Sequence, residues 1–254
     1  MCTLSVVTGE AGYRLAMNRD ETISRGPGLP PANYRLNGVN AVYPTDGSAG
    51  TWIGANEGGI TLALLNWNDC PQPPASEKLR SRGLVIPNLL ASRSLAEFQA
   101  SLDVLDLQGM FPFRLVGVFP SERALWEWRW DSQRFSCEVH EWESRHWFSS
   151  GLSDEQAHRM RGTVCGSAWS EPDAGTSAWL RRLHASHESG HGPFSMCVHR
   201  EGVESLSYSE VSCTQQGIRF GHFVGSPCRM DLDRMSTLEL AGRWPETGIG
   251  PAVV

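Results

Sequence analysis

The chain has 254 residues, of which 40% are hydrophobic and 20% charged, a balance typical of a globular protein with a sizeable core. Its net charge of −6 argues against a nucleic-acid partner, and no apolar run reaches the roughly 18 residues of a membrane span. Seven cysteines without a CxxC spacing predict reduced thiols rather than a disulfide framework or a zinc site, and the start of the chain does not resemble a signal peptide. We therefore expect one domain over residues 1–254, located in the cytoplasm.

The first predicted element is a β-hairpin that brings the start of the chain beside a polar motif. The two strands and the glycine-containing turn between them are expected at residues 2–8, 13–17 and 9–12. A hairpin of this length places Asn18 and Asp20 close to Cys2. The alternative is that the Asn-Arg-Asp-Glu motif forms only a polar turn with a surface ion pair.

Cys2 carries the chemistry that makes this hairpin a candidate catalytic site. If Met1 is trimmed, Cys2 has both a thiol and a free α-amine, whose ordinary pKa of about 7.7–8 suits it to take and return a proton. Asp20 can orient that amine, Asn18 can hold a substrate carbonyl, and Arg19 is a cation expected to favour the thiolate. We therefore expect Cys2 to be the most reactive cysteine. The structural alternative is a small buried residue that starts an edge strand.

Residues 25–48 are rich in glycine, proline and asparagine, and we expect them to form an irregular excursion that makes one wall of a cleft. The side chains expected on the cleft walls are aromatic or apolar: Leu29, Pro30, Tyr34, Trp52 and Trp67. Such a cleft would suit an acyl group or a flat apolar body with an anionic end.

A second hairpin is predicted from residues 51–55 and 59–66, and its near-continuous apolar run is typical of a strand covered on both faces. Asn66 ends that strand, where a buried amide needs partners or a function. We expect its side chain to point toward the Cys2 thiol, unless it closes a turn with Asn68 and Asp69.

The middle of the chain predicts one helix and a β-meander. Ser94 followed by Glu97 is a capping box, so a helix is expected over residues 94–102. Three strands with tight turns are then predicted at 113–118, 124–130 and 135–140. The three tryptophans that alternate along the second of these strands are expected to pack in the core rather than line an aromatic ligand site.

The last third predicts helices, then strands. Residues 151–192 are expected to be helical and polar, and three histidines suggest a solvated helix end in preference to a metal site: His184, His187 and His191. A hairpin over residues 196–211 and a last strand at 219–224 follow. Strands, helices and strands in this order suit an α+β sandwich of two antiparallel sheets covered by helices.

Several of these segments resemble the NRDE family, the group of proteins like transport and Golgi organisation protein 2. The resemblance rests on Met1-Cys2-Thr3, Asn18-Arg19-Asp20-Glu21, Gly50-Thr51-Trp52-Ile53-Gly54 and Leu64-Leu65-Asn66. More distantly the chain is similar to choloylglycine hydrolases and other N-terminal-nucleophile (Ntn) acylases, with matches at Asn18, Asp20, Asn56-Glu57-Gly58-Gly59 and Leu65-Asn66-Trp67. The resemblance implies a four-layer αββα sandwich.

The sequence also departs from the hydrolase pattern. The hydrolases have an arginine where this chain has Met17, and Arg19, on the same strand face, is the expected substitute. Their amide-bearing segment corresponds to residues 148–151, so the hydroxyls of Ser149 and Ser150 replace amides. The hydrolases carry another arginine further toward the C-terminus, and it has three candidate counterparts here: Arg159, Arg161 and Arg181.

Two functions follow from these observations. The first is an Ntn cysteine amidohydrolase or acyltransferase that acts on a small amide or thioester, with Cys2 as nucleophile and Asn66 in the oxyanion site. The second, which the resemblance implies, is a non-catalytic carrier or trafficking protein for haem or an acyl lipid. We expect no metal and no cofactor, and the sequence does not indicate an oligomeric state.

Overall fold

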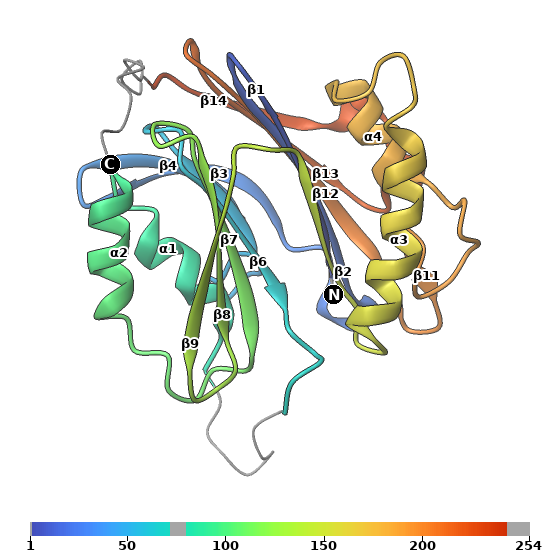
Figure 1. Cartoon of the computed structure of the whole chain (residues 1–254), viewed down its shortest axis with the longest axis horizontal. Helices are drawn as coiled ribbons and strands as arrows, with labels where there is room; N and C mark the ends of the chain where they lie inside the picture. The colour runs from blue at the N-terminus through green and yellow to red at the C-terminus, as the bar shows by residue number, and fades with distance from the viewer. Residues whose placement is uncertain (1, 72–79, 243–254) are drawn as a thin grey trace.

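Two antiparallel β-sheets lie face to face in the computed structural model, which describes residues 2–71 and 80–242 (Figure 1). The strands of the first sheet are β1 (Cys2–Gly9), β2 (Gly12–Thr22), β10 (Arg145–Ser149), β11 (His199–Arg200), β12 (Val203–Thr214), β13 (Gly217–Val224) and β14 (Ser236–Leu240). Their order is β10-β1-β2-β12-β13-β14, with β11 paired to β12. The chain's first hairpin thus lies inside the sheet, with β2 between β1 and β12.

The second sheet follows the sequence order without a crossover. Its strands are β3 (Leu29–Leu36), β4 (Val39–Thr45), β5 (Ile53–Asn56), β6 (Thr61–Asn66), β7 (Phe113–Phe119), β8 (Ala124–Trp130) and β9 (Phe135–His140). The hairpin of β5 and β6 and the meander of β7 to β9 confirm the predictions from hydrophobic periodicity. β5 is buried throughout, as expected for a strand covered on both faces.

Helices cover the outer face of each sheet, which gives four layers and confirms the predicted α+β sandwich (Figure 1). The second sheet carries α1 (Val85–Leu89) and α2 (Leu95–Asp103), and the first sheet carries α3 (Asp154–Ala168) and α4 (Ser177–Ala185). Short 3-10 turns are η1 (Ile23–Arg25), η2 (Arg82–Leu84), η3 (Pro227–Arg229) and η4 (Leu232–Arg234). Among the described residues, no helix is both long and apolar enough to cross a membrane.

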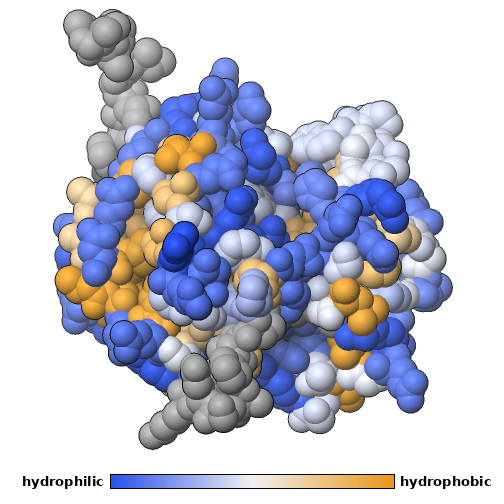
Figure 2. All heavy atoms as spheres, turned by 60° about the horizontal axis from the view of Figure 1, so that its bottom comes forward, coloured by the Kyte–Doolittle hydropathy of each residue, from blue (hydrophilic) through white to orange (hydrophobic). Residues whose placement is uncertain are grey.

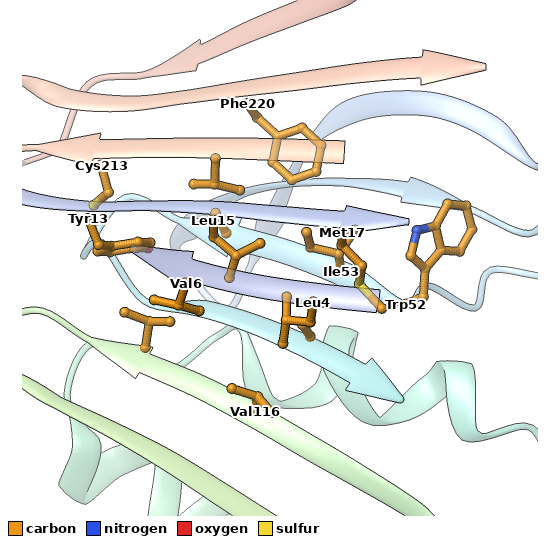
Figure 3. Packing of buried hydrophobic residues seen from close by; sticks show 14 of the residues in the cluster. Leu4, Val6, Tyr13, Leu15, Met17, Trp52, Ile53, Val116, Cys213 and Phe220 are labelled. Atoms are coloured by element: carbon orange, nitrogen blue, oxygen red, sulfur yellow. The ribbon is translucent and has the colours of Figure 1, made fainter. Parts of the chain in front are cut away.

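The core between the sheets is built from alternate residues of facing strands. Leu4, Leu15 and Met17 of the first sheet point toward Ile53 and Val116 of the second (Figure 3). The other side of the first sheet faces α3 and α4, where Val7 and Ala16 are buried against the helices. The strand period therefore gives β1 and β2 one apolar face toward the second sheet and one face toward the helices.

The capping prediction for α2 is confirmed, because the Ser94 hydroxyl accepts a hydrogen bond from the Glu97 amide at 3.2 Å. The Glu97 carboxylate accepts from Arg93 N–H at 2.8 Å, one residue before the position that a capping box predicts. The prediction of tryptophans in the core is also confirmed. Trp128 is buried against Phe98 of α2, and Trp126 stacks on Trp128.

Three predictions about secondary structure or burial are wrong. Residues 25–48 are not an irregular excursion: they contain β3 and β4, and β4 is largely buried because its apolar residues supply both faces of a central strand. The strand that ends at Val224 is not the last one, since β14 follows it in the sequence and pairs with it. His184 is fully buried rather than at a solvated helix end, because α4 packs that side against β2.

The surface at the end of the molecule that comes forward in Figure 2 is mainly hydrophilic, with separate hydrophobic groups toward its two sides. This is the end at which β1 begins and β6 ends (Figure 1). Hydrophilic residues therefore meet solvent at this end of the sandwich.

Candidate active site

The Asn-Arg-Asp-Glu motif is part of strand β2 rather than a polar turn. β2 continues to Thr22, and Cys2 pairs with Arg19 across the hairpin. Because side chains alternate along a strand, Arg19 lies on the same side as Cys2, toward the second sheet, whereas Asn18 lies on the side of the helices. The two sides of β2 consequently place the motif's side chains in two different environments.

Cys2 lines a cavity of about 350 Å³ at the end of the sandwich where β1 begins and β2 and β6 end. Arg19, Asp20, Trp52 and Asn66 line the same cavity, so the structure brings together five residues that the sequence analysis selected. Cys2 is only 5% exposed despite its position at the strand start. The cavity volume falls at the low end of the range for small-molecule sites, about 300–1,000 Å³.

The walls of this cavity are more charged than the sequence analysis predicted. Four arginines and three carboxylates line it: Arg19, Arg25, Arg80, Arg82, Asp20, Glu21 and Asp46. The expectation that Leu29, Pro30 and Tyr34 form a wall is wrong. Leu29 is exposed, and the Tyr34 ring stacks on Tyr43 in the hydrophobic cluster beneath α1, because both belong to the β3–β4 hairpin.

The cavity arginines differ in their partners. Arg25 pairs with Glu21 at 3.0 Å, and the Arg19 guanidinium lies 4.6 Å from the centre of the Trp52 ring. Arg82 donates to the Pro112 carbonyl at 2.8 Å, and within residues 2–71 and 80–242 no carboxylate lies within ion-pair distance of it. Arg82 is thus the cavity cation best able to receive an anion from outside. Sequence reasoning missed it because η2 lies more than sixty residues from the motif.

The Cys2 backbone is held from two directions. Its N–H donates to the Ser149 hydroxyl at 2.9 Å, and its carbonyl accepts from Arg161 Nη1 at 3.3 Å. Burial raises the pKa of the Cys2 thiol, Asp20 raises it further, and Arg19 acts against both. The environment therefore favours the neutral thiol, in contrast to the expected thiolate, because desolvation outweighs the charge of Arg19.

Of the three arginines that could correspond to the C-terminal arginine of the hydrolases, Arg161 is the one that contacts Cys2 and Asp20. It is fully buried in α3, donates to the Thr3 hydroxyl at 2.7 Å, and lies 3.5 Å from the Asp20 carboxylate. Asp20 also accepts from the Ser205 hydroxyl at 2.6 Å, while burial raises the pKa of Asp20. Arg181 instead pairs with Glu210, and Arg159 is exposed.

The other predicted site residues lie away from the cavity. Asn18 donates to the carbonyls of His184 and Met196 at 2.9 and 2.8 Å, and its oxygen lies 3.1 Å from His184 Nδ1. Ser150 accepts from the Leu152 amide, and neither Ser150 nor Trp67 lines the cavity. Ser149 does not line the cavity, but its hydroxyl accepts the hydrogen bond that holds the Cys2 backbone N–H.

Comparisons with known proteins give the family of this chain and a similar fold. The family model described as transport and Golgi organisation 2 matches residues 1–163, and no curated protein matches the chain. Among solved structures, penicillin V acylase from Agrobacterium tumefaciens is similar with a TM-score of 0.53 and 11% identity, over 88% of this chain and 83% of that one. The C2A mutant of conjugated bile acid hydrolase from Clostridium perfringens has a TM-score of 0.48 and 10% identity, over 98% and 100% of the two chains.

At these identities the acylase likeness concerns the fold, which is the Ntn-hydrolase sandwich. The family match covers the strands that carry Cys2 and the Asn-Arg-Asp-Glu motif, and it ends within α3, just after Arg161. The chain belongs to the transport and Golgi organisation 2 family, also called the NRDE family.

Proposed function

We propose that the protein is an Ntn cysteine amidohydrolase or acyltransferase that acts on a small amide or thioester with an anionic group, with Cys2 as nucleophile. The observation that carries the proposal is the shared cavity, in which Cys2 lies together with Asp20, Asn66 and four arginines. A nucleophile, an amide donor and a charged binding surface in one small cavity are the parts that acyl transfer needs.

The proposed reaction begins after removal of Met1, which gives Cys2 a free α-amine. The same nitrogen, as a peptide N–H, bonds the Ser149 hydroxyl at 2.9 Å. As an amine it would take the thiol proton while sulfur attacks the substrate carbonyl, and it would pass that proton to the leaving nitrogen or thiol as the acyl bond breaks. Water, or an acceptor amine, then cleaves the acyl-cysteine. Asp20 supplies the negative charge that orients the protonated amine.

The raised pKa of the Cys2 thiol fits a base-assisted attack. A thiol that stays protonated near neutral pH needs its proton removed as the carbon–sulfur bond forms, and a base on the same residue requires no further positioning. The thiol pKa thus supports a role for the α-amine that a preformed thiolate would not need.

Two further cavity residues fit substrate binding. The Asn66 amide can donate to the oxyanion that develops on the substrate, a type of contact worth about 10²–10³-fold in rate. Arg82 can pair with a carboxylate on the substrate, in the bidentate manner that suits guanidinium groups. A carrier for haem or an acyl lipid would be expected to have broad apolar walls, and the charged lining of this cavity favours the enzyme instead.

The test combines mass and turnover. Intact-mass measurement of protein from its native host should show loss of Met1. A panel of N-acyl amino acids and acyl thioesters should be turned over by wild type, lost with Cys2→Ala, lowered about 10²–10³-fold in kcat with Asn66→Ala, and retained with the exposed-cysteine control Cys137→Ala. Retention of Met1, or turnover that survives Cys2→Ala, would refute the proposal. Haem binding that ignores Cys2→Ala, without turnover, would support the carrier.

A further inference from the structure

Two histidines and two cysteines converge outside the cavity, beneath the loop that follows α4. His187 lies in that loop, Cys197 lies two residues before β11, His199 begins β11, and Cys228 lies in η3. One ligand atom of each residue lies within 4.8 Å of the corresponding atoms of the other three. These four residues come from three segments of the chain without a recognised metal-ligand spacing, so their sequence positions alone do not indicate the cluster.

We propose that His187, Cys197, His199 and Cys228 bind one Zn²⁺ ion. The ion would connect both η3 and the loop after α4 to the segment that begins β11. Two thiolates and two imidazoles are the donor set of many structural zinc sites. Two thiolates also neutralise the charge of the ion, so a partly buried site carries no net charge.

The distances between ligand atoms match a tetrahedral site. His199 Nε2 lies 3.5 Å from Cys197 Sγ and 3.3 Å from Cys228 Sγ. With Zn–S near 2.3 Å and Zn–N near 2.0–2.1 Å, tetrahedral angles place a sulfur and a nitrogen ligand about 3.5 Å apart. The His199 ring therefore already lies where a shared ion would place it relative to both thiols.

The surroundings of the two histidines also fit metal binding. Nδ1 of His187 is shielded from solvent and has no hydrogen-bond partner among the described residues, an arrangement that costs free energy unless a ligand completes it. Nδ1 of His199 lies 3.8 Å from the Glu204 carboxylate. A carboxylate on the far side of a ligating imidazole is a common support of metal-bound histidine, because it fixes the ring orientation.

The position of this site gives it a structural role. None of the four residues lines the cavity that contains Cys2. Cys197 is flanked by Met196, whose carbonyl accepts from Asn18, and by Val198, whose amide donates to the Ser205 hydroxyl at 2.9 Å. A metal ion here would hold the segment that packs against Asn18 and Ser205, on the helix side of β2.

The experiment uses untagged full-length protein, prepared under reducing conditions without chelators, with zinc measured by mass spectrometry of the metal. Wild type should contain one zinc ion per chain, and Cys228→Ser should lose at least nine-tenths of it. Cys228 is exposed, so this variant should still fold. Two controls, Cys137→Ser and His158→Asn, change exposed residues outside the cluster and should retain the metal.

A second measurement identifies the ligands. Co²⁺ added to metal-free wild type should give the intense visible bands of a tetrahedral ion and a thiolate charge-transfer band, and Cys197→Ser and Cys228→Ser should each weaken the latter. Wild type that takes up neither Zn²⁺ nor Co²⁺ with its thiols reduced would overturn the proposal. So would a native Cys197–Cys228 disulfide, seen as a loss of two hydrogens in the intact mass.

Discussion

Strand β2 presents different polar chemistry on its two sides. Toward the second sheet, Arg19 borders a cavity that it shares with Cys2, and its guanidinium lies over Trp52. Toward the helices, Asn18 is fully buried and bonded to two backbone carbonyls. Two adjacent residues of one short motif thus lie in a cavity wall and in a packed interior, because alternation along a strand sends them to opposite faces.

Asp20 joins the two environments. Its carboxylate lies beside Arg161 and Ser205 on the helix side, yet it also lines the cavity. The register of β2 against β12 shifts between Ser205 and Ser207, next to this residue. The motif therefore cannot be read as one set of catalytic groups, and substitutions on the two sides should have different consequences.

The largest effect is expected on the helix side, at Arg161. Arg161→Met should lower the free energy of unfolding by about 3–5 kcal/mol, because it leaves the Asp20 carboxylate buried without its cation. Urea unfolding measures this, and Arg159→Met on the exposed side of α3 is the matched control, expected within about 0.5 kcal/mol of wild type. Equal stabilities of the two variants would contradict the role given to the buried pair.

A smaller loss is expected at Asn18. Asn18→Ala removes a donor that serves the carbonyls of His184 and Met196, so unfolding should become easier by about 1–3 kcal/mol. Asn88→Ala, which removes an exposed amide bonded to the Leu84 carbonyl, should change stability by less than about 0.5 kcal/mol. If Asn18→Ala abolishes turnover and leaves the unfolding curve unchanged, Asn18 acts in chemistry and the separation of the two sides fails.

The helix side should also be sensitive to acid. Burial lowers the pKa of His184 to about 3, below the ordinary 6.5, so the folded protein holds this imidazole neutral while the unfolded chain protonates. Stability should fall as pH drops from about 6.5 toward 3, by up to about 1.4 kcal/mol per pH unit for this group.

His146 and His222, each with a pKa lowered to about 4 by burial, should add to the same loss. Urea unfolding at a series of pH values tests this. In His184→Gln, the free energy of unfolding should depend less steeply on pH, by the contribution of one proton. An unchanged slope in that variant would show that His184 does not cause the acid sensitivity.

The smallest effect on stability is expected on the cavity side. Arg19→Gln removes the contact with Trp52, at a cost of about 1 kcal/mol, and it also removes a charge that lowers the pKa of Cys2. Alkylation of Cys2 by iodoacetamide should therefore require a higher pH than in wild type. Peptide mapping follows this reaction, and Arg14→Gln, exposed on the same strand, should leave the pH profile unchanged.

Wild-type labelling provides the reference for that comparison. Because burial raises the pKa of the Cys2 thiol, its alkylation should rise at higher pH than that of a free cysteine. The sequence analysis predicts that Cys2 is nevertheless the most reactive of the seven cysteines. Faster labelling of Cys70 or Cys137 in folded protein, with Cys2 inert, would refute its assignment as nucleophile.

Local patterns in the sequence determine most of the secondary structure. Alternating residues and glycine turns predict the first hairpin and the meander of β7 to β9, and Ser94 predicts the start of α2. The glycine and proline content of residues 25–48 suggests an irregular segment, but these residues include the apolar side chains that are buried on both faces of β4. Periodicity predicts a strand, but it does not reveal which strands lie at the centre of a sheet.

The sequence by itself determined the hairpin that brings the Asn-Arg-Asp-Glu motif beside Cys2, because register follows from turn length over a few residues. Only the tertiary structure decided which distant groups complete each site. Arg161 reaches the Cys2 carbonyl across 159 positions of sequence, Arg82 enters the cavity wall from η2, and Cys228 approaches His199 from η3. The packing of helices and turns on the sheets sets these contacts, and no short-range pattern of residue types specifies it.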